Sequence, residues 1–281
     1  MKENRLMLGA VAYDPKVVTI WEGFRTWFAQ RDFDFDFILY SNYEAQVQGH
    51  FAGQYDVAWN SPLAWIQAER VAKARGLQAR AIAMRDTDQD LTSVIVVRSD
   101  SNVQSVADLT GKTIGVGAHD SPQATLIPLN HLASSGLHKD IDYNVRVFDV
   151  LVGKHGDHIG GERDAARALM AGEVDAACMI DGNHLVFTNE GTLPSGQTRI
   201  LSQTDPYDHC CFTILGEPTP IMKQFVDYLL AMSYDDPDVR HLLDLEGLKQ
   251  WKTGRVSGFE QLNEACDRFG YLDGFLSEMS S

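Results

Sequence analysis

Three junctions in this chain combine residue types that can hold an anion. Each one has an apolar run, then an Asp or Ser residue, then a proline that opens a helical pattern: Asp14-Pro15, Ser61-Pro62 and Ser121-Pro122. A helix start presents backbone N–H groups without partners together with the positive end of the helix dipole. The junctions therefore predict anion capture at helix starts. Taken singly, each is also an ordinary helix start, with proline at the first position behind a capping residue.

The apolar pattern around these junctions alternates between strands and helices. The spacing predicts strands over residues 6–12, 33–40, 55–59, 79–84, 91–98, 112–116, 145–151, 174–180, 199–202 and 210–215. It predicts helices over residues 16–30, 43–51, 63–75, 122–134, 161–171, 220–232 and in the stretch 245–274. Such alternation favours parallel sheets. Ligands of open α/β sheets bind at the carboxyl ends of the strands, where all three junctions fall, so we expect a shared cleft.

Three segments follow one another in a characteristic order and spacing: "YDVAWNSPLAWIQAER", "ADLTGKTIGVGAHDSPQATLIPLNHL" and "GERDAARALMAGEVDAACMIDGNH". Through them, residues 6–232 resemble the substrate-binding proteins of phosphonate and phosphite ABC transporters. The resemblance implies an α/β fold of two Rossmann-like domains joined by two crossover strands, the type 2 periplasmic-binding-protein fold. It also implies a non-enzymatic protein that captures a small oxyanion between its domains by hinge closure and delivers it to an ABC permease.

The resemblance carries over to particular residues. In the family, hydroxyls and amides at one helix start hold the phosphonate, and here that helix start is residues 121–125. The implied contacts are Tyr13, Trp59, Asn60, Ser61, Ser121, Gln123, Ala124, Thr125 and Asp181. Four further residues at predicted strand ends complete the candidate ligand-binding set: Asp14, His119, Asp120 and His184. Where the family shows a run of Ser and Thr, this chain offers only two hydroxyls and one amide.

The charge balance narrows the ligand class. The formal net charge of −15 excludes nucleic acid and anionic membranes as natural partners, because both require a basic surface. Asp14, Asp120 and Asp181 stand at predicted strand ends, while the junctions contain no Lys or Arg, so a bare dianion would be repelled. The ligand is then either a phosphonate-like molecule that carries an amine, with Asp181 on the ammonium, or a molecule other than a phosphonate. The alternative for Asp14 and Asp120 is that each merely caps its helix.

The chain is long enough for two domains, which we place at residues 1–88 with 241–281 (domain I) and 89–240 (domain II). No apolar run reaches the ~20 residues of a membrane helix, so no transmembrane segment is expected. The first residues show no export signal. The protein is then cytoplasmic as written, or periplasmic if a leader has been removed.

Histidines and cysteines supply the competing hypotheses. The pair His155 and His158 and the run His209-Cys210-Cys211 match no metal-binding spacing, so we expect no metal and no cofactor. The run faintly resembles the cysteine-rich stretch of the thiamine-pyrimidine synthases, iron-using enzymes of the same fold. A buried crossover strand over residues 210–215, in which cysteine behaves as a small hydrophobic residue, is the preferred explanation. The alternative function is thus a cytoplasmic enzyme, metal-dependent or a lyase similar to the chorismate-dehydratase group. Neighbouring cysteines favour a reducing compartment, and a Cys178–Cys266 disulfide stays open.

Overall fold

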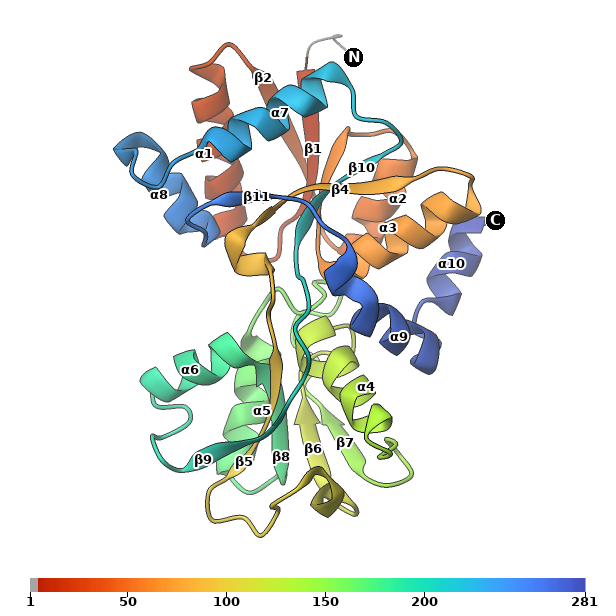
Figure 1. Ribbon diagram of the computed structural model, residues 1–281, viewed down its shortest axis with the longest axis vertical. Helices are drawn as coiled ribbons and strands as arrows, with labels where there is room; N and C mark the ends of the chain where they lie inside the picture. Colours follow the sequence, from red (N-terminus) through yellow and green to blue (C-terminus); the bar gives the residue numbers. More distant parts are fainter. Residues whose placement is uncertain (1–4, 281) are drawn as a thin grey trace. The chain divides into compact units, whose positions relative to one another are not determined.

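The computed structural model describes residues 5–280, which fold into two compact units (Figure 1). Unit 1 comprises the chain up to Gln89, Asp208–Phe259 and the residues from Leu272 on. Unit 2 comprises Asp90–Tyr207 and Glu260–Tyr271. The first segment of domain I was predicted to end at residue 88, one residue before the end of the first segment of unit 1. The prediction that residues 208–240 belong to the middle domain was wrong, because the strand within them completes the sheet of unit 1.

Unit 1 is built on a six-stranded mixed sheet in the order β11-β4-β10-β3-β1-β2. The strands are β1 (Arg5–Val11), β2 (Asp34–Tyr40), β3 (Val57–Asn60), β4 (Ala79–Arg85), β10 (Cys211–Leu215) and β11 (Trp251–Thr253). Strand β1 is parallel to β2 and β3, whereas β10 is antiparallel to β3 and β4, and β11 is antiparallel to β4. The alternation predicted the parallel pairs of this sheet, and the sheet is mixed because β10 comes from unit 2 and runs antiparallel between β3 and β4.

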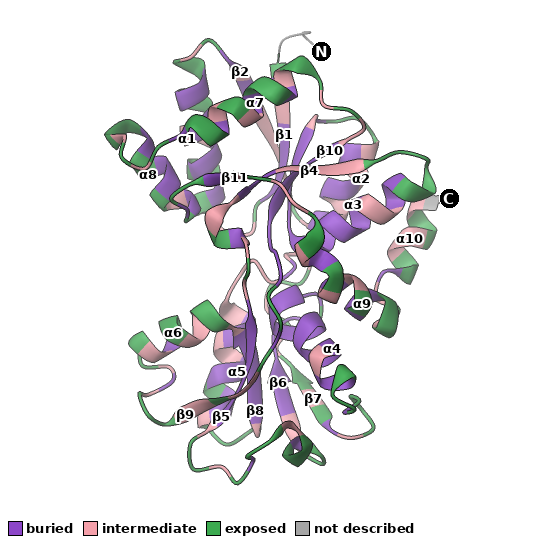
Figure 2. Cartoon of the chain, in the orientation of Figure 1, coloured by how far each residue is buried: buried purple, intermediate pink, exposed green. Residues whose placement is uncertain are grey.

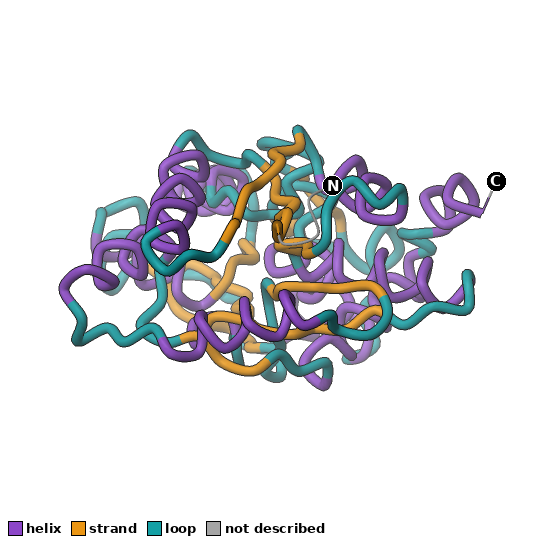
Figure 3. The backbone as a smooth tube through the Cα atoms, turned by 90° about the horizontal axis from the view of Figure 1, so that it is seen from above, coloured by secondary structure: helices purple, strands orange, loops and turns teal. Residues whose placement is uncertain are grey.

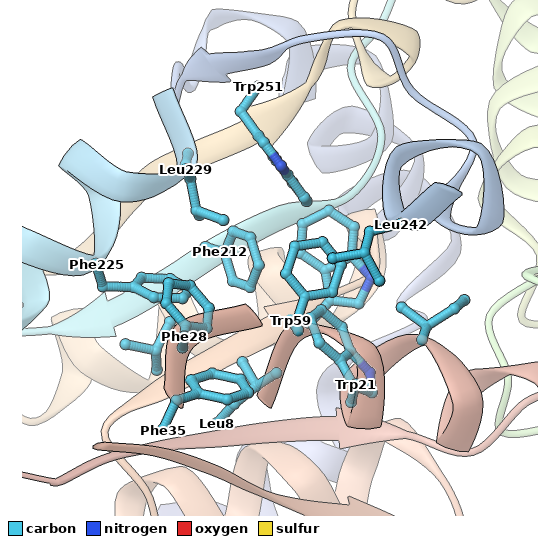
Figure 4. Packing of buried hydrophobic residues seen from close by; sticks show 14 of the residues in the cluster. Leu8, Trp21, Phe28, Phe35, Trp59, Phe212, Phe225, Leu229, Leu242 and Trp251 are labelled. Carbon is cyan, nitrogen blue, oxygen red and sulfur yellow. The ribbon is translucent and has the colours of Figure 1, made fainter. Parts of the chain in front are cut away.

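Helices cover this sheet and bury an aromatic core. They are α1 (Lys16–Ala29), α2 (Tyr43–Phe51), α3 (Pro62–Ala74), α7 (Pro220–Ala231), α8 (Pro237–Glu246) and α10 (Asp273–Ser280), with short turns η1 (Asp86–Asp88) and η4 (Ser257–Phe259). Trp21 of α1, Phe212 of β10 and Trp251 of β11 point toward one another around Trp59 (Figure 4). Each such side chain is at most 4% exposed, and its burial stabilises the fold by about 2–3 kcal/mol.

Unit 2 has a five-stranded mixed sheet in the order β7-β6-β8-β5-β9. Its strands are β5 (Ser93–Arg98), β6 (Thr113–Val116), β7 (Asn144–Val147), β8 (Ala176–Ile180) and β9 (Thr198–Gln203). Strand β6 is parallel to β7 and β8, and β5 is antiparallel to β8 and β9. The helices are α4 (Ile127–Ser134), α5 (Gly160–Met170), α6 (Asp181–Asn189) and α9 (Glu260–Phe269), with turns η2 (Val106–Leu109) and η3 (Pro122–Leu126). Helix α4 is buried over most of its surface, whereas α6 buries only Phe187 (Figure 2), and Figure 3 shows the helices, strands and loops along the same backbone.

Two features of the described residues bear on the hypotheses above. All four cysteines, Cys178, Cys210, Cys211 and Cys266, are buried free thiols, so Cys178 and Cys266 form no disulfide. Burial raises the pKa of the Cys178 and Cys211 thiols to about 12, which keeps them protonated and unreactive. Within residues 5–280, no helix has the length and apolar character needed to cross a membrane.

Candidate functional site

The helix start in unit 2 has an unusual backbone. Residues 122–126 form a π-helical turn, η3, which continues directly into α4. Ser121 caps it: its Oγ accepts a hydrogen bond from the Ala124 N–H at 3.2 Å. Leu126 N–H bonds to Ser121 O across the widened turn. Because π-turns interrupt regular helix bonding and occur often at functional sites, this turn is the natural place to look for a ligand.

The side chains of this turn are buried and hydrogen-bonded to neighbouring segments. Thr125 Oγ1 donates to Ala118 O at 2.8 Å, so this hydroxyl proton is engaged within the fold. Gln123 Nε2 donates to Gly156 O at 2.6 Å and to Glu162 Oε1 at 3.3 Å. Ser121, Gln123, Ala124 and Thr125 are each at most 5% exposed. The turn is therefore held in place by its own side chains.

A loop between β7 and α5 packs on this helix start. Asp120 Oδ2 accepts the N–H groups of Gly153 at 2.5 Å and His155 at 3.3 Å, which fixes the loop to the residue before the cap. Gly156 lies so close that a Cβ there would overlap Ser121 Oγ and lie 2.7 Å from Gln123 Nε2. His155 is fully buried and adopts a left-handed conformation with φ of 48°. Such a φ is uncommon for a residue other than glycine, so the surrounding contacts must hold the loop in this shape.

Two buried acceptors beneath this loop have no hydrogen-bond partner among the described residues. They are Asp120 Oδ1 and Gln123 Oε1, on side chains that are 2% and 3% exposed. A buried polar atom without a partner is costly and is normally satisfied by water or a ligand. These atoms can therefore receive donors that the chain does not supply, which agrees with a ligand carrying N–H or O–H groups.

The end of the neighbouring strand β8 carries Asp181 and His184. Asp181 is exposed, and its carboxylate accepts Thr92 Oγ1 at 3.0 Å and the Gly182 N–H at 2.6 Å. His184 lies one turn along α6; burial lowers its pKa, and its Nε2 is buried without a partner in the described part of the chain. A neutral imidazole and an oriented carboxylate thus stand at this strand end.

His119 lies just before Asp120 and differs from it in exposure. Its backbone N–H and its Nδ1 both lie 2.9 Å from Asp149 Oδ1, with the two side chains about half exposed. Partial burial would raise the pKa of Asp149, but the hydrogen bonds from the His119 backbone and ring outweigh it and lower that pKa. The pair therefore keeps a carboxylate at the edge of the site.

In unit 1, two predicted site residues lie at the start of α1. Asp14 Oδ1 accepts the Lys16 N–H at 2.8 Å, the local contact expected of a capping residue. Tyr13 is partly buried, and the Lys16 ammonium lies 5.8 Å from the centre of its ring. The Asp14 carboxylate thus bonds to its own helix, as the capping alternative expects.

The other unit 1 candidates lie at the end of β3. Asn60 is fully buried, and its Oδ1 accepts Gln46 Nε2 at 2.7 Å. Ser61, also fully buried, caps α3 through Ala64 N–H at 3.1 Å. Trp59 lies inside the aromatic core, 4.6 Å from the Phe212 ring. Ser61 and Trp59 are engaged within the fold, whereas Asn60 Nδ2 is buried without a partner among the described residues and could donate to an oxyanion. Their role in ligand binding stays a prediction.

Within unit 2 the fold does bring the predicted residues together, through a residue that sequence reasoning missed. Glu162 of α5 is 2% exposed; its Oε1 accepts Gln123 Nε2, and its Oε2 accepts Ile180 N–H at 3.0 Å and Asn183 Nδ2 at 2.8 Å. It thereby links the η3 turn to the end of β8. The sequence did contain one indication of Glu162. It follows Gly161 on the buried face of a predicted helix, where a charged residue is unexpected.

One group of possible metal ligands occurs among the described residues: Asp88, His209 and Cys210, whose ligand atoms lie within 4.8 Å of one another. Arg85 binds the same carboxylate through Nε at 2.5 Å and a second nitrogen at 2.8 Å. Burial would raise the pKa of Asp88, but Arg85 outweighs it and lowers that pKa to about 2. Because a guanidinium already neutralises Asp88, we assign no metal to this cluster.

Two α/β units on mixed sheets, with chain crossings between them and proline-opened helix starts at strand ends, define a two-domain ligand-binding protein of the type 2 periplasmic-binding-protein fold. Residues 10–259 match the family model described as the periplasmic phosphonate substrate-binding protein of ABC transporters. The chain belongs to this family. It is a substrate-binding component of a transporter, with a permease as its partner, and the enzyme alternative has no support.

Solved structures agree on the fold. The chain is similar to PhnD1 from Prochlorococcus marinus in complex with methylphosphonate, with 18% identity, a TM-score of 0.69, and coverage of 95% of this chain and 98% of that one. It is similar to a binding protein component of a phosphonate transporter, PA3383 from Pseudomonas aeruginosa, with 13% identity, a TM-score of 0.63, and coverage of 99% and 97%. The aliphatic sulphonate binding protein SsuA from Escherichia coli shows 15% identity, a TM-score of 0.58, and coverage of 96% and 88%.

Proposed function

We propose that this protein captures a small phosphonate-like ligand at the η3 helix start of unit 2 and acts in the periplasm, as its family does. The observation that carries this proposal is the π-helical turn capped by Ser121, at the start of a helix. The turn supplies N–H groups and the positive helix end for the oxyanion. The PhnD1 structure holds methylphosphonate, which fits a ligand of this class.

The ligand also carries an amine. Asp181 is exposed and oriented by Thr92, so its carboxylate can accept a charge-assisted hydrogen bond from an ammonium group. Asp120 adds a second carboxyl group beside the helix start, and negative charge here disfavours a bare dianion. A zwitterion resolves this conflict because its positive group offsets the local negative charge.

Calorimetric titration with methylphosphonate and an aminoalkylphosphonate tests both parts of the proposal. We expect the aminoalkylphosphonate to bind more tightly. Changing Ser121→Ala should weaken binding by about 1–3 kcal/mol, because the Ser121 hydroxyl can donate to the oxyanion while the Thr125 hydroxyl donates to Ala118 O. Equal affinities for the two ligands would contradict the amine, while unchanged affinity in Ser121→Ala would move the oxyanion site elsewhere.

Thr219→Ala provides the matched control. Thr219 caps α7 in unit 1 through the Met222 N–H at 3.4 Å, so its loss imposes a similar capping defect outside the proposed site. We expect lower thermal stability with unchanged ligand affinity. A drop in affinity equal to that of the Ser121 variant would show that the effect reflects general destabilisation.

A further inference from the structure

Two buried amide side chains meet at the end of β3 in unit 1. Gln46 of α2 and Asn60 of β3 are both fully buried. Gln46 Nε2 donates to Asn60 Oδ1 at 2.7 Å and to the backbone oxygen of Trp59 at 3.1 Å. The backbone of Gln46 is held as well, because the Tyr55 hydroxyl donates to Gln46 O at 2.5 Å. The amide pair is therefore a fixed part of unit 1.

These contacts fix the direction in which each amide faces. The Trp59 oxygen is a backbone carbonyl and can only accept a hydrogen bond, so the Gln46 atom that reaches it must be the nitrogen Nε2. The same nitrogen also reaches the Asn60 side chain, so the Asn60 atom beside it must be the oxygen Oδ1. The amide nitrogen of Asn60 is thereby left for another partner.

Asn60 Nδ2 has no hydrogen-bond partner among residues 5–280, although the side chain is fully buried. An unpaired buried donor is costly and is normally satisfied by water or a ligand. An amide nitrogen donates but does not accept, so it suits an oxyanion oxygen and not an ammonium group. Asn60 directly precedes Ser61, the cap of the 13-residue helix α3, whose positive end also favours an anion. The other unpaired atom of the pair is Gln46 Oε1, an acceptor on α2.

We propose that Asn60 donates a hydrogen bond from Nδ2 to an acceptor atom of the ligand, and that Gln46 is a positioning residue that keeps the Asn60 amide in this orientation. This inference rests on the proposed function, since it takes the ligand to be an oxyanion. It goes further by giving unit 1 an uncharged donor for the ligand and by assigning a role to Gln46, which acts on the ligand only through Asn60.

Calorimetric titration with methylphosphonate tests the role of Asn60. Asn60→Asp keeps the side-chain shape and the oxygen that accepts from Gln46, but it replaces the donor nitrogen by a second oxygen. The affinity should therefore fall by about tenfold or more. Unchanged affinity in this variant would contradict the proposed hydrogen bond to the ligand.

A double-mutant cycle tests the role of Gln46. Gln46→Met keeps the approximate side-chain volume but removes the donor that orients Asn60, so the affinity should fall by about threefold. In the Asn60→Ala background there is no amide to orient, and Gln46→Met should then have no further effect on affinity. A purely structural role of Gln46 would lower the affinity by the same factor in both backgrounds.

Gln67→Met is the matched control. Gln67 of α3 is another buried glutamine of unit 1 with an unpaired Oε1, and its Nε2 lies 3.5 Å from Glu44 Oε1. We expect the affinity to stay at the wild-type value. A loss equal to that in Gln46→Met would contradict the positioning role, because any change of a buried glutamine in unit 1 would then weaken binding.

The outcomes separate this inference from the proposed function. If the wild-type protein binds neither methylphosphonate nor the aminoalkylphosphonate, the proposed function is wrong and this inference falls with it. If Ser121→Ala weakens binding and Asn60→Asp does not, only the inference is wrong. Should the Asn60 variants fail to fold, a crystal structure of the wild-type protein with methylphosphonate decides. A ligand oxygen about 3 Å from Asn60 Nδ2 would support the inference, and a water in that position would overturn it.

Discussion

The helix starts after β3 in unit 1 and after β6 in unit 2 share a Ser-Pro sequence but differ in structure. Ser61 begins a regular α-helix, and the Asn60 side chain beside it bonds to Gln46. Ser121 begins a π-helical turn covered by a loop, with the buried acceptors Asp120 Oδ1 and Gln123 Oε1 left without partners among the described residues. Neither junction is fully satisfied among the described residues, because Asn60 Nδ2 is also buried without a partner. The same Ser-Pro signal thus leaves a donor unpaired in unit 1 and acceptors unpaired in unit 2.

The largest difference between the two helix starts should appear in protein stability when Gly156, which packs on the second of them, is changed. A Cβ here would overlap Ser121 Oγ, and the φ of 76° disfavours any other residue. We expect Gly156→Ala to reduce the free energy of unfolding by about 2 kcal/mol more than Gly136→Ala does. Gly136 has a similar φ of 87° but no atom within 4 Å of the added Cβ, so the difference isolates the loop contact. Urea unfolding of both variants measures it, and equal midpoints would mean that the loop does not pack on this turn.

A smaller effect should separate two aspartates, Asp120 and Asp14. Asp120 Oδ2 holds the loop through two backbone N–H groups, whereas Asp14 bonds only to the nearby Lys16 N–H. We expect Asp120→Asn to cost about 1–2 kcal/mol and Asp14→Asn less than about 0.5 kcal/mol. Hydrogen exchange should also become faster across residues 150–157 in the first variant alone. Unchanged exchange there would show that Asp120 does not anchor the loop.

The sequence predicted the strand–helix order well because apolar periodicity is a local property. It identified β3 with α3 and β6 with the helix that follows, and it placed the capping residues Ser61 and Ser121 correctly. It missed the short strand β11 and the helix α6. The three residues of β11 are too few to show a period, while α6 buries only Phe187, so its apolar stripe is weak.

The non-local features could not be predicted in the same way. The insertion of β10 between β3 and β4 depends on pairing between segments about 130 to 150 residues apart, which no local pattern reports. The roles of Glu162 and Gly156 likewise depend on contacts across the fold. A buried Glu and a loop Gly look in the sequence like a surface charge and a flexible hinge.

The smallest expected effect concerns Ser61 and is the sharpest test of the comparison. Its Oγ accepts the Ala64 N–H and is fully buried, so Ser61→Ala should cost about 1 kcal/mol of stability, as the loss of a helix cap does. If Ser61 serves only as a helix cap, ligand affinity should stay at the wild-type value in Ser61→Ala, whereas Ser121→Ala lowers it. Thermal melting and calorimetric titration of the two serine variants, made side by side, give both quantities. A matching loss of affinity in Ser61→Ala would mean that Ser61 is itself a ligand contact, as its family resemblance implies, and that both helix starts serve the ligand.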